Sequence, residues 1–222
     1  MQHKIICTDD GSHTIYVPEL DETYHSKHGA VNESIHVYIE NGLKHFYGKS
    51  ELTILEIGFG TGLNCWLVAT DPKAHNIKIK YITLEPFPID YEIAASLNYT
   101  QDSDEISKNI FQKIHFAEFE KETQITPFFS LLKLKTPLAE FSMNLKADLV
   151  FYDAFGPSKQ PEMWTENVLE KVSECMASES LLVTYCSQGA FKRIMKSLGY
   201  TLEHPAGPWG KREMTVAKKN SI

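Results

Sequence analysis

Short apolar runs rich in β-branched residues alternate along this chain with segments whose apolar positions have helical spacing. The alternation predicts a doubly wound α/β sheet, since strands that alternate with helices favour parallel pairing with helices on both faces. The expected strands include residues 52–56, 77–85, 147–153, 180–187, 200–203 and 213–217, with one more inside 128–141. The expected helices cover about 64–69, 88–113, 164–172 and 189–198.

The first 46 residues show a different pattern. Two β-rich runs flank the turn signal Asp9–Ser12, which predicts an N-terminal hairpin. A polar loop, 21–29, precedes a helical pattern at about 32–46, for which Asn32 or Ser34 is the expected cap. One face of this helix is expected to pack on the sheet.

The composition bounds the domain organisation. With 222 residues, of which 42% are hydrophobic, one well-packed domain is expected. Residues 1–50 are predicted to form a hairpin, loop and helix packed on a core of residues 51–222. No run of ~18 apolar residues is present, and the N-terminus lacks the apolar segment of a signal peptide, so a cytoplasmic protein without a membrane partner is expected.

The cysteines, histidines and charges narrow the function further. The four cysteines form no Cys-x-x-Cys pair and the nine histidines include no His-Glu-x-x-His, so neither a metal site nor a disulfide framework is predicted. A net charge of -7 argues against a protein coated with basic residues for nonspecific nucleic-acid binding. A local basic rim remains compatible with it, and so does an ordinary solvated helix face; the basic positions concerned are Lys192, Arg193, Lys196, Lys211, Arg212, Lys218 and Lys219.

The stretch 52–63, LTILEIGFGTGL, carries the most specific motif. A buried strand ends at Glu56 and is followed by glycines at 58, 60 and 62, where a missing Cβ permits positive φ and close approach of a ligand. The spacing differs from the dinucleotide fingerprint, and the Gly-Lys-Ser/Thr ending of a P-loop is absent. It resembles motif I of class I S-adenosylmethionine methyltransferases. A glycine-rich turn without a ligand is the alternative.

Acidic residues end two further predicted strands. Glu85 is the last residue of the strand expected at 77–85, and Asp153 is the last residue of the strand that begins at Ala147. Because the carboxyl ends of adjacent parallel strands line one crevice, Glu85 is placed to accept hydrogen bonds from a ribose diol, although a solvated acid at a strand end is the alternative. Asp153 is expected in the same crevice.

Five separated segments resemble the methyltransferase domain of the MnmC family, bacterial enzymes that complete 5-methylaminomethyl-2-thiouridine at the tRNA wobble position. Two are long, LEIGFGTGLN at 55–64 and DAFGPSKQPEMW at 153–164. The other matching positions are Asp21, Tyr24, Ser26 and Gly29, then Glu85-Pro86-Phe87-Pro88, and Lys211-Arg212-Glu213-Met214. The chain departs from the family at 135–137, Lys-Thr-Pro, where the family often has Gly-Asp; the nearest acid is Glu140.

The resemblance implies a class I methyltransferase fold, S-adenosyl-L-methionine as cofactor, and tRNA as partner, with the aminomethyl group of a modified wobble uridine as acceptor. Because the sequence ends at Ile222, a free-standing form without the family's oxidase domain is expected. The implied cofactor-binding residues are Glu56, Gly58, Phe59, Gly60, Thr61, Gly62, Asn64, Glu85, Pro86 and Asp153. The implied catalytic residues are Asp153 and Tyr24, and the implied substrate-binding residues are Phe155, Pro157, Trp209, Lys211 and Arg212.

The expected chemistry concerns one proton. An alkylamine with a pKa near ~10.4 is only about one part in a thousand neutral at pH 7, and only the neutral amine can attack a sulfonium methyl group. Asp153 is the candidate to accept hydrogen bonds from this amine, either as a base or as an orienting acceptor. A structural aspartate that caps the following turn is the alternative. Tyr24, Phe155 and Trp209 are candidates to stack on the uracil, or are core aromatics.

Two other classes of function stay open from the sequence. A transferase of the same fold that acts on a small amine, such as an aminopropyl transferase, also combines a glycine loop with acidic strand ends. A noncatalytic binding module that retains the fold is the second, and the presence of Glu56, Glu85 and Asp153 argues against it.

Overall fold

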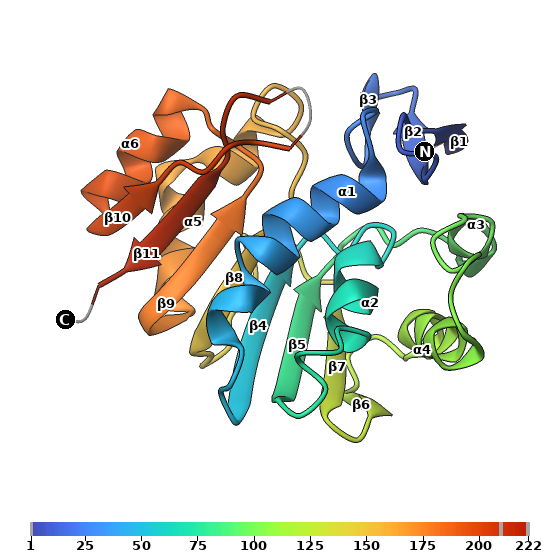
Figure 1. The fold of residues 1–222 in the computed structure, drawn as a ribbon. Coiled ribbons are helices and arrows are strands. Elements are labelled where there is room, and N and C mark those ends of the chain that lie inside the picture. Colours follow the sequence, from blue (N-terminus) through green and yellow to red (C-terminus); the bar gives the residue numbers. More distant parts are fainter. Residues whose placement is uncertain (1, 209–210, 221–222) are drawn as a thin grey trace.

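A computed structural model describes residues 2–208 and 211–220. An eight-stranded sheet with helices on both faces forms the body of the protein, and a three-stranded sheet lies beside it near the N-terminus (Figure 1). The strand order of the large sheet is β10-β11-β9-β8-β4-β5-β7-β6. The arrangement is a doubly wound α/β fold, as the alternation of apolar patterns predicts.

The five central strands of the large sheet pair parallel with one another, and the three outer strands pair antiparallel with their neighbours. β6 is antiparallel to β7, β11 to β9, and β10 to β11. The parallel strands are β7 (Phe129–Leu134), β5 (Lys78–Leu84), β4 (Glu51–Ile57), β8 (Ala147–Tyr152) and β9 (Met176–Thr184). The outer strands are β6 (Thr123–Thr126), β11 (Thr215–Lys219) and β10 (Tyr200–Glu203). The sequence pattern did not predict β6, because its four residues include one buried apolar side chain, Ile125.

Successive side chains of each central strand face two different layers of helices. In β4, Ile54 packs in the cluster of apolar side chains on one face, and Leu55 packs in the cluster on the other. The first face is covered by α1 (Ala30–Ser34), the π-helix η1 (Ile35–Glu40), α2 (Leu63–Ala69), α3 (Tyr91–Ala95) and α4 (Glu105–Phe116). The second is covered by α5 (Glu166–Glu174) and α6 (Gly189–Ser197), with the 3₁₀ turn η3 (Pro161–Trp164).

The predicted N-terminal hairpin is present. β1 (Lys4–Cys7) pairs antiparallel with β2 (His13–Val17), and the short β3 (Glu22–Thr23) adds a third strand. The loop of the hairpin caps α1, since Ser12 Oγ accepts a hydrogen bond from the backbone N–H of Ala30 at 3.1 Å. Asp10 Oδ2 accepts one from Asn32 N–H, also at 3.1 Å. The division of the chain at residue 50 stays a prediction.

The helix expected at 32–46 is wrong in its details. It begins at Ala30, changes to π-helical geometry at Ile35 and ends at Glu40, and a separate 3₁₀ turn, η2, covers Leu43–Phe46. Its N-cap residue is Gly29, so neither Asn32 nor Ser34 is the cap. Gly42 interrupts the helix where the backbone packs closely, because a Cβ there would lie 2.5 Å from the Tyr38 carbonyl oxygen.

The single helical segment expected at 88–113 is also divided. Residues 96–104 separate α3 from α4, and Asp104 begins the second helix by accepting a hydrogen bond from Ser107 N–H at 2.7 Å. Apolar spacing alone does not show such a break, because both helices use it.

Strand β4 lies between β5 and β8, which places it at the switch point of the sheet. The chain leaves β4 through α2 on one face and leaves β8 toward α5 on the other. In open α/β sheets, ligands bind outside the carboxyl ends of the strands at such a point.

Candidate active site

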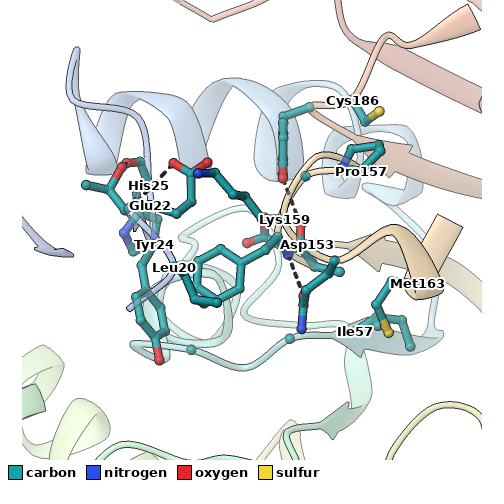
Figure 2. Close-up of a pocket in the computed structure, with 18 of the residues that line it drawn as sticks. Leu20, Glu22, Tyr24, His25, Ile57, Asp153, Pro157, Lys159, Met163 and Cys186 are labelled. Carbon is teal, nitrogen blue, oxygen red and sulfur yellow. Dashed lines mark hydrogen bonds between the residues drawn. The ribbon is translucent and has the colours of Figure 1, made fainter. Parts of the chain in front are cut away.

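A cavity of about 1100 Å³ opens at the carboxyl ends of β4, β5, β8 and β9. The glycine loop follows β4, Glu85 follows β5, Asp153 follows β8 and Tyr185 follows β9, and all of them line the cavity. The segment from Glu22 to His28, after the N-terminal hairpin, forms another part of its wall. Figure 2 shows Tyr24, Asp153 and Pro157 around this space.

The glycine loop is fitted closely against its neighbours. Gly58 has a φ of +91°, and a Cβ on it would lie 2.7 Å from the Asp153 carbonyl oxygen. Gly60 has a φ of +50°, and a Cβ there would lie 3.0 Å from the Tyr24 ring. Both positions therefore require glycine, and the loop offers bare backbone to the cavity. Gly62, by contrast, packs against Phe59 and His115 and does not line the cavity.

Glu85 is bound to the glycine loop through its carboxylate. Oε2 accepts a hydrogen bond from Gly60 N–H, and Oε1 accepts one from Phe87 N–H, both at 3.0 Å. Burial raises the pKa of Glu85, and these two bonds oppose the rise. Each carboxylate oxygen can accept two hydrogen bonds, so each keeps one lone pair that can accept a hydrogen bond from a hydroxyl group. The residues present therefore fit a nucleoside whose ribose diol meets Glu85.

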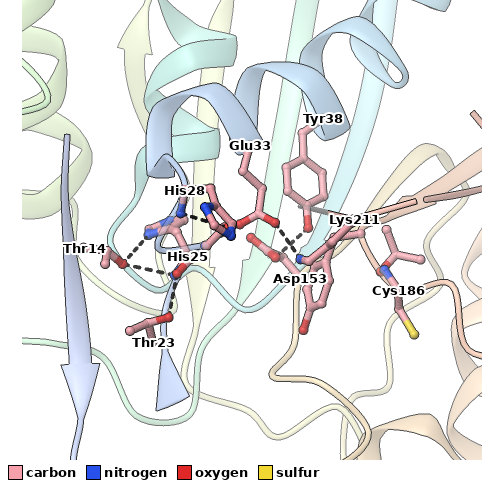
Figure 3. Close-up of polar contacts among 12 residues, drawn as sticks. Thr14, Thr23, His25, His28, Glu33, Tyr38, Asp153, Cys186 and Lys211 are labelled. Atoms are coloured by element: carbon pink, nitrogen blue, oxygen red, sulfur yellow. Dashed lines mark hydrogen bonds and ion pairs between the residues drawn. The ribbon is translucent and has the colours of Figure 1, made fainter. Parts of the chain in front are cut away.

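Asp153 is held by two side chains from the layer of helices above β8. Tyr38 Oη donates a hydrogen bond to Oδ1 at 2.5 Å (Figure 3). Asn64 Nδ2 donates one to Oδ2 at 2.8 Å. Burial raises the pKa of Asp153 to about 7, against the opposing effects of these donors. A carboxylate with this pKa is a much better proton acceptor near neutral pH than an exposed aspartate.

The sequence analysis missed Tyr38, which is almost completely buried at 1% exposure. Its ring packs on Phe151 with centroids 5.0 Å apart, while its hydroxyl reaches Asp153. It lies in the π-helix η1, and such turns often occur at functional sites. The only sequence signal was a tyrosine on the apolar side of a helical pattern, which an ordinary core tyrosine also gives.

Glu56 lies behind the cavity and does not line it. It is 0% exposed, and neither carboxylate oxygen has a hydrogen bond of good geometry to the described residues. Burial raises the pKa of Glu56 to about 8, and the nearby side chains of Thr83, Tyr81 and Asn64 oppose this rise. Glu56 is therefore a buried carboxyl group near Asn64, the residue that donates a hydrogen bond to Asp153.

Lys211, which the sequence indicated both as a substrate-binding residue and as part of a possible basic rim, lines the cavity. Its Nζ lies 2.7 Å from Glu33 Oε1 and 4.1 Å from the centre of the Tyr185 ring. Glu33, which the sequence analysis did not single out, is only 7% exposed. Its partner is 178 residues away along the chain, so no local pattern joins the two.

Other residues of the expected basic rim also have partners. Lys192 pairs with Glu213 at 2.5 Å, and Lys218 pairs with Glu203 at 2.5 Å. Lys219 donates hydrogen bonds to the carbonyl oxygens of Ser173 and Met176. The exposed cations among the predicted set are Arg193, Lys196 and Arg212.

The structure brings together most of the site residues that the sequence indicated. Those that line the cavity, in addition to Glu85 and Asp153, are Tyr24, Gly58, Phe59, Gly60, Thr61, Asn64, Pro86, Phe155, Pro157 and Lys211. Tyr24 and Phe155 meet edge to face with centroids 5.3 Å apart. Arg212 is exposed outside the cavity, as is Glu140, and Trp209 lies outside the described residues.

Residues 2–208 and 211–220 contain no group of three or more His, Cys, Asp or Glu side chains arranged to hold a metal ion. None of their helices has the length and apolar character needed to cross a membrane.

Residues 98–220 match a family described as S-adenosyl-L-methionine-dependent methyltransferases. Among curated proteins, the tRNA 5-methylaminomethyl-2-thiouridine biosynthesis bifunctional protein MnmC of Cupriavidus metallidurans is 28% identical over 96% of this chain and 33% of the relative. The protein of that name from Leptospira interrogans is 30% identical over 89% of this chain and 32% of the relative. The chain thus spans about a third of the length of these relatives.

Solved structures give a consistent result. MnmC2 from Aquifex aeolicus superimposes with a TM-score of 0.80 and 25% identity, covering 100% of this chain and 71% of that one. Spermidine synthase from Thermotoga maritima superimposes with a TM-score of 0.54 and 13% identity, covering 99% of this chain and 72% of that one. The second likeness shows a shared fold.

Proposed function

Since this chain belongs to the family of S-adenosyl-L-methionine-dependent methyltransferases, we propose that it methylates the aminomethyl group of 5-aminomethyl-2-thiouridine at the wobble position of tRNA. The relatives are named for the biosynthesis of 5-methylaminomethyl-2-thiouridine, and a methyltransferase forms that product by adding one methyl group to an aminomethyl nitrogen. The observation that carries the proposal is the single cavity that joins a glycine loop, Glu85 and a buried, doubly hydrogen-bonded Asp153.

The cofactor side of the cavity is formed by the glycine loop and Glu85. The backbone of Gly58 and Gly60 allows close approach, and Glu85 has acceptor capacity for a ribose diol. Pro86 and Phe87 continue the wall beside Glu85. S-adenosyl-L-methionine, when bound, supplies an electrophilic methyl group on its sulfonium sulfur.

The acceptor side is organised around Asp153. Its carboxylate receives the proton that the ammonium form of the acceptor must lose, and its pKa of about 7 suits this role near neutral pH. Tyr38 and Asn64 fix the carboxylate so that it faces the cavity. The freed nitrogen lone pair forms the new N–C bond while the C–S bond breaks, and that electron pair stays on sulfur. The methylated amine leaves with a positive charge.

Aromatic side chains provide the surface for the base. Tyr24 and Phe155 line the cavity in contact with one another, and Pro157 lies beside Phe155 in the turn after β8. Bases that leave the stack of single-stranded RNA are commonly held against aromatic side chains. Burial raises the pKa of Tyr24, so its hydroxyl stays protonated and available as a donor. The exposed Arg193, Lys196 and Arg212 are candidates for phosphate contacts. A tRNA substrate supports a cytoplasmic location.

Labelled methyl transfer tests the proposal. The protein is incubated with methyl-labelled S-adenosyl-L-methionine and with tRNA that carries the aminomethyl group but lacks its methyl group, and the tRNA is then digested to nucleosides. Label in 5-methylaminomethyl-2-thiouridine is expected. Incubation of the small amines putrescine and spermidine with methyl-labelled S-adenosyl-L-methionine, and with decarboxylated S-adenosyl-L-methionine labelled in its aminopropyl group, tests the alternative of a small-amine transferase. Label in the amines and none in tRNA would contradict the proposal.

A further inference from the structure

Lys211 carries a fixed positive charge within the cavity. Its ammonium group lies between Glu33 Oε1, at 2.7 Å, and the face of the Tyr185 ring, at 4.1 Å from its centre. Both partners are held in turn. Ser26 N–H donates a hydrogen bond to Glu33 Oε2 at 2.6 Å, and the Tyr185 hydroxyl donates one to the Ala154 carbonyl oxygen at 2.8 Å. The position of Lys211 is therefore tied to the turn that follows Asp153.

Figure 3 shows Lys211 and Glu33 beside Asp153 and Tyr38. Without Lys211, an amine beside Asp153 would approach two carboxylates, Glu33 and Asp153. Two negative charges favour the protonated form of a nearby amine, and that form cannot be methylated. The ion pair with Lys211 compensates the negative charge of Glu33. Asp153 is then left as the carboxylate that acts on the acceptor.

Two titratable groups near Lys211, Asp153 and the Cys186 thiol, respond to its charge, which lowers the pKa of each. Burial raises the pKa of Asp153, Glu33 raises it further and Lys211 lowers it. Burial also raises the pKa of Tyr38, of Tyr185 and of the Cys186 thiol, so these three groups are uncharged at neutral pH. Of the charged residues that line the cavity, Glu33 and Lys211 are the two that act on Asp153. Glu22, Lys27, Glu85, Lys159 and Glu162 line the cavity as well.

Building on the proposed function, we propose that Lys211 is a further active-site residue whose fixed ammonium, paired with Glu33, keeps the acceptor amine in its uncharged form. A contact to a tRNA phosphate and a purely structural tie between Glu33 and Lys211 are the two competing roles. They differ in measurable ways, because only a charge effect on the acceptor changes the pH at which transfer begins.

The test uses four proteins: wild type, Lys211→Met, Lys211→Arg and the double variant Glu33→Gln with Lys211→Met. Single-turnover methylation of tRNA that carries the aminomethyl group is measured from pH 6 to 9 with saturating cofactor. In Lys211→Met, we expect transfer at pH 7 to be at least about tenfold slower, with the rising limb moved about one pH unit upward. Lys211→Arg keeps the charge and should keep the wild-type limb. The double variant removes both charges and should move the limb back toward that of wild type.

Each other outcome contradicts the inference in a distinct way. An unchanged pH limb in Lys211→Met with a higher KM for tRNA indicates a phosphate contact. A slower rate that is the same fraction of wild type at every pH, with a lower melting temperature, indicates a structural tie. If the double variant is as impaired as Lys211→Met at every pH, charge compensation of Glu33 is refuted. If the wild-type protein transfers no methyl group to this tRNA, the proposed function itself fails, and the inference fails with it.

Discussion

The hydroxyl of Tyr38, in a π-helical turn on one side of the sheet, donates a 2.5 Å hydrogen bond to the carboxylate of Asp153 at the end of β8. The bond joins residues 115 positions apart. It fixes the orientation of the carboxylate and favours its charged form, so it bears directly on how Asp153 handles a proton.

Replacing Tyr38 with Phe removes this bond and leaves the aromatic ring. The hydrogen bond from Tyr38 lowers the pKa of Asp153, so its loss raises that pKa further and leaves less carboxylate at neutral pH. A hydrogen bond to a charged group contributes about 1.5–3 kcal/mol, so we expect transfer to slow by at least about tenfold at pH 7 and by less at pH 8.5. Tyr47→Phe, which removes a 2.8 Å bond to Asp71, is the matched control. Equal losses in both variants would argue against the role of Tyr38.

Substituting Asp153 by Asn or Ala separates catalysis from stability. We expect a folded protein that binds S-adenosyl-L-methionine and transfers methyl at least ~10²-fold more slowly, the scale of a positioned acid–base group. Raising the pH toward 9 should partly restore the rate, because more free amine is then present. Asp148→Ala, in the same strand, loses a 2.8 Å bond from Thr53 N–H and should affect stability alone. Near-normal single-turnover rates in Asp153→Ala would refute the assignment.

The affinity for the cofactor should depend on Glu85. Glu85→Ala removes the acceptor for a ribose diol and also releases the backbone of Gly60. We expect binding of S-adenosyl-L-methionine to weaken by about 1.5–3 kcal/mol in calorimetric titration. Glu51→Ala, at the exposed start of β4, is the control and should bind as wild type does. Unchanged affinity in a folded Glu85→Ala protein would move the ribose away from this residue.

Two glycines with nearly the same φ test the fit of the glycine loop. Gly58 and Gly48 have φ values of +91° and +90°, but only at Gly58 would a Cβ meet another atom, the Asp153 carbonyl oxygen at 2.7 Å. Gly48→Ala should therefore cost only the backbone term, about 1–2 kcal/mol. Gly58→Ala should cost more in urea denaturation and should also slow transfer, because Asp153 must move. Equal free energies of unfolding would contradict the close fit.

Glu56 gives a prediction for stability against pH. Its pKa rises from 4.5 in the unfolded chain to about 8 in the folded protein, mainly through burial. Between these values unfolding releases a proton, so the contribution of Glu56 to stability is full below pH 4.5 and is lost as the pH rises through 8. Glu56→Gln lacks this loss. The free energy of unfolding of Glu56→Gln, taken relative to that of wild type, should increase by about 2–5 kcal/mol between pH 5 and pH 8. A difference that does not change with pH would contradict a titrating Glu56.

The sequence predicted those parts of the site in which an acidic residue stands at the end of a predicted parallel strand. Glu85 and Asp153 end parallel strands, and the carboxyl ends of such strands meet at one edge, so their proximity followed from the strand pattern alone. The glycine loop was readable because its φ values and close contacts leave few other residues possible. These are features that local sequence specifies.

The parts that were missed depend on contacts between distant segments. Tyr38 reaches Asp153 only because the helix turns π-helical at Ile35 and stops before Gly42, where the backbone packs on its neighbours. Lys211 looked like one member of an exposed basic group, and only the fold brings it to Glu33. Glu56 belongs to the glycine motif in sequence, yet its side chain is fully buried and does not line the cavity.

The ion pair between Glu33 and Lys211 also has a consequence for biosynthesis. A ribosome makes Glu33 178 residues before Lys211, and contacts of such long sequence separation form slowly because a large loop must close first. A nascent chain that has reached Asp153 already contains the glycine loop, Tyr38 and Glu85, and it still has Glu33 without its cation. Completion of this wall of the cavity must therefore await synthesis of the last strand and its docking against β9.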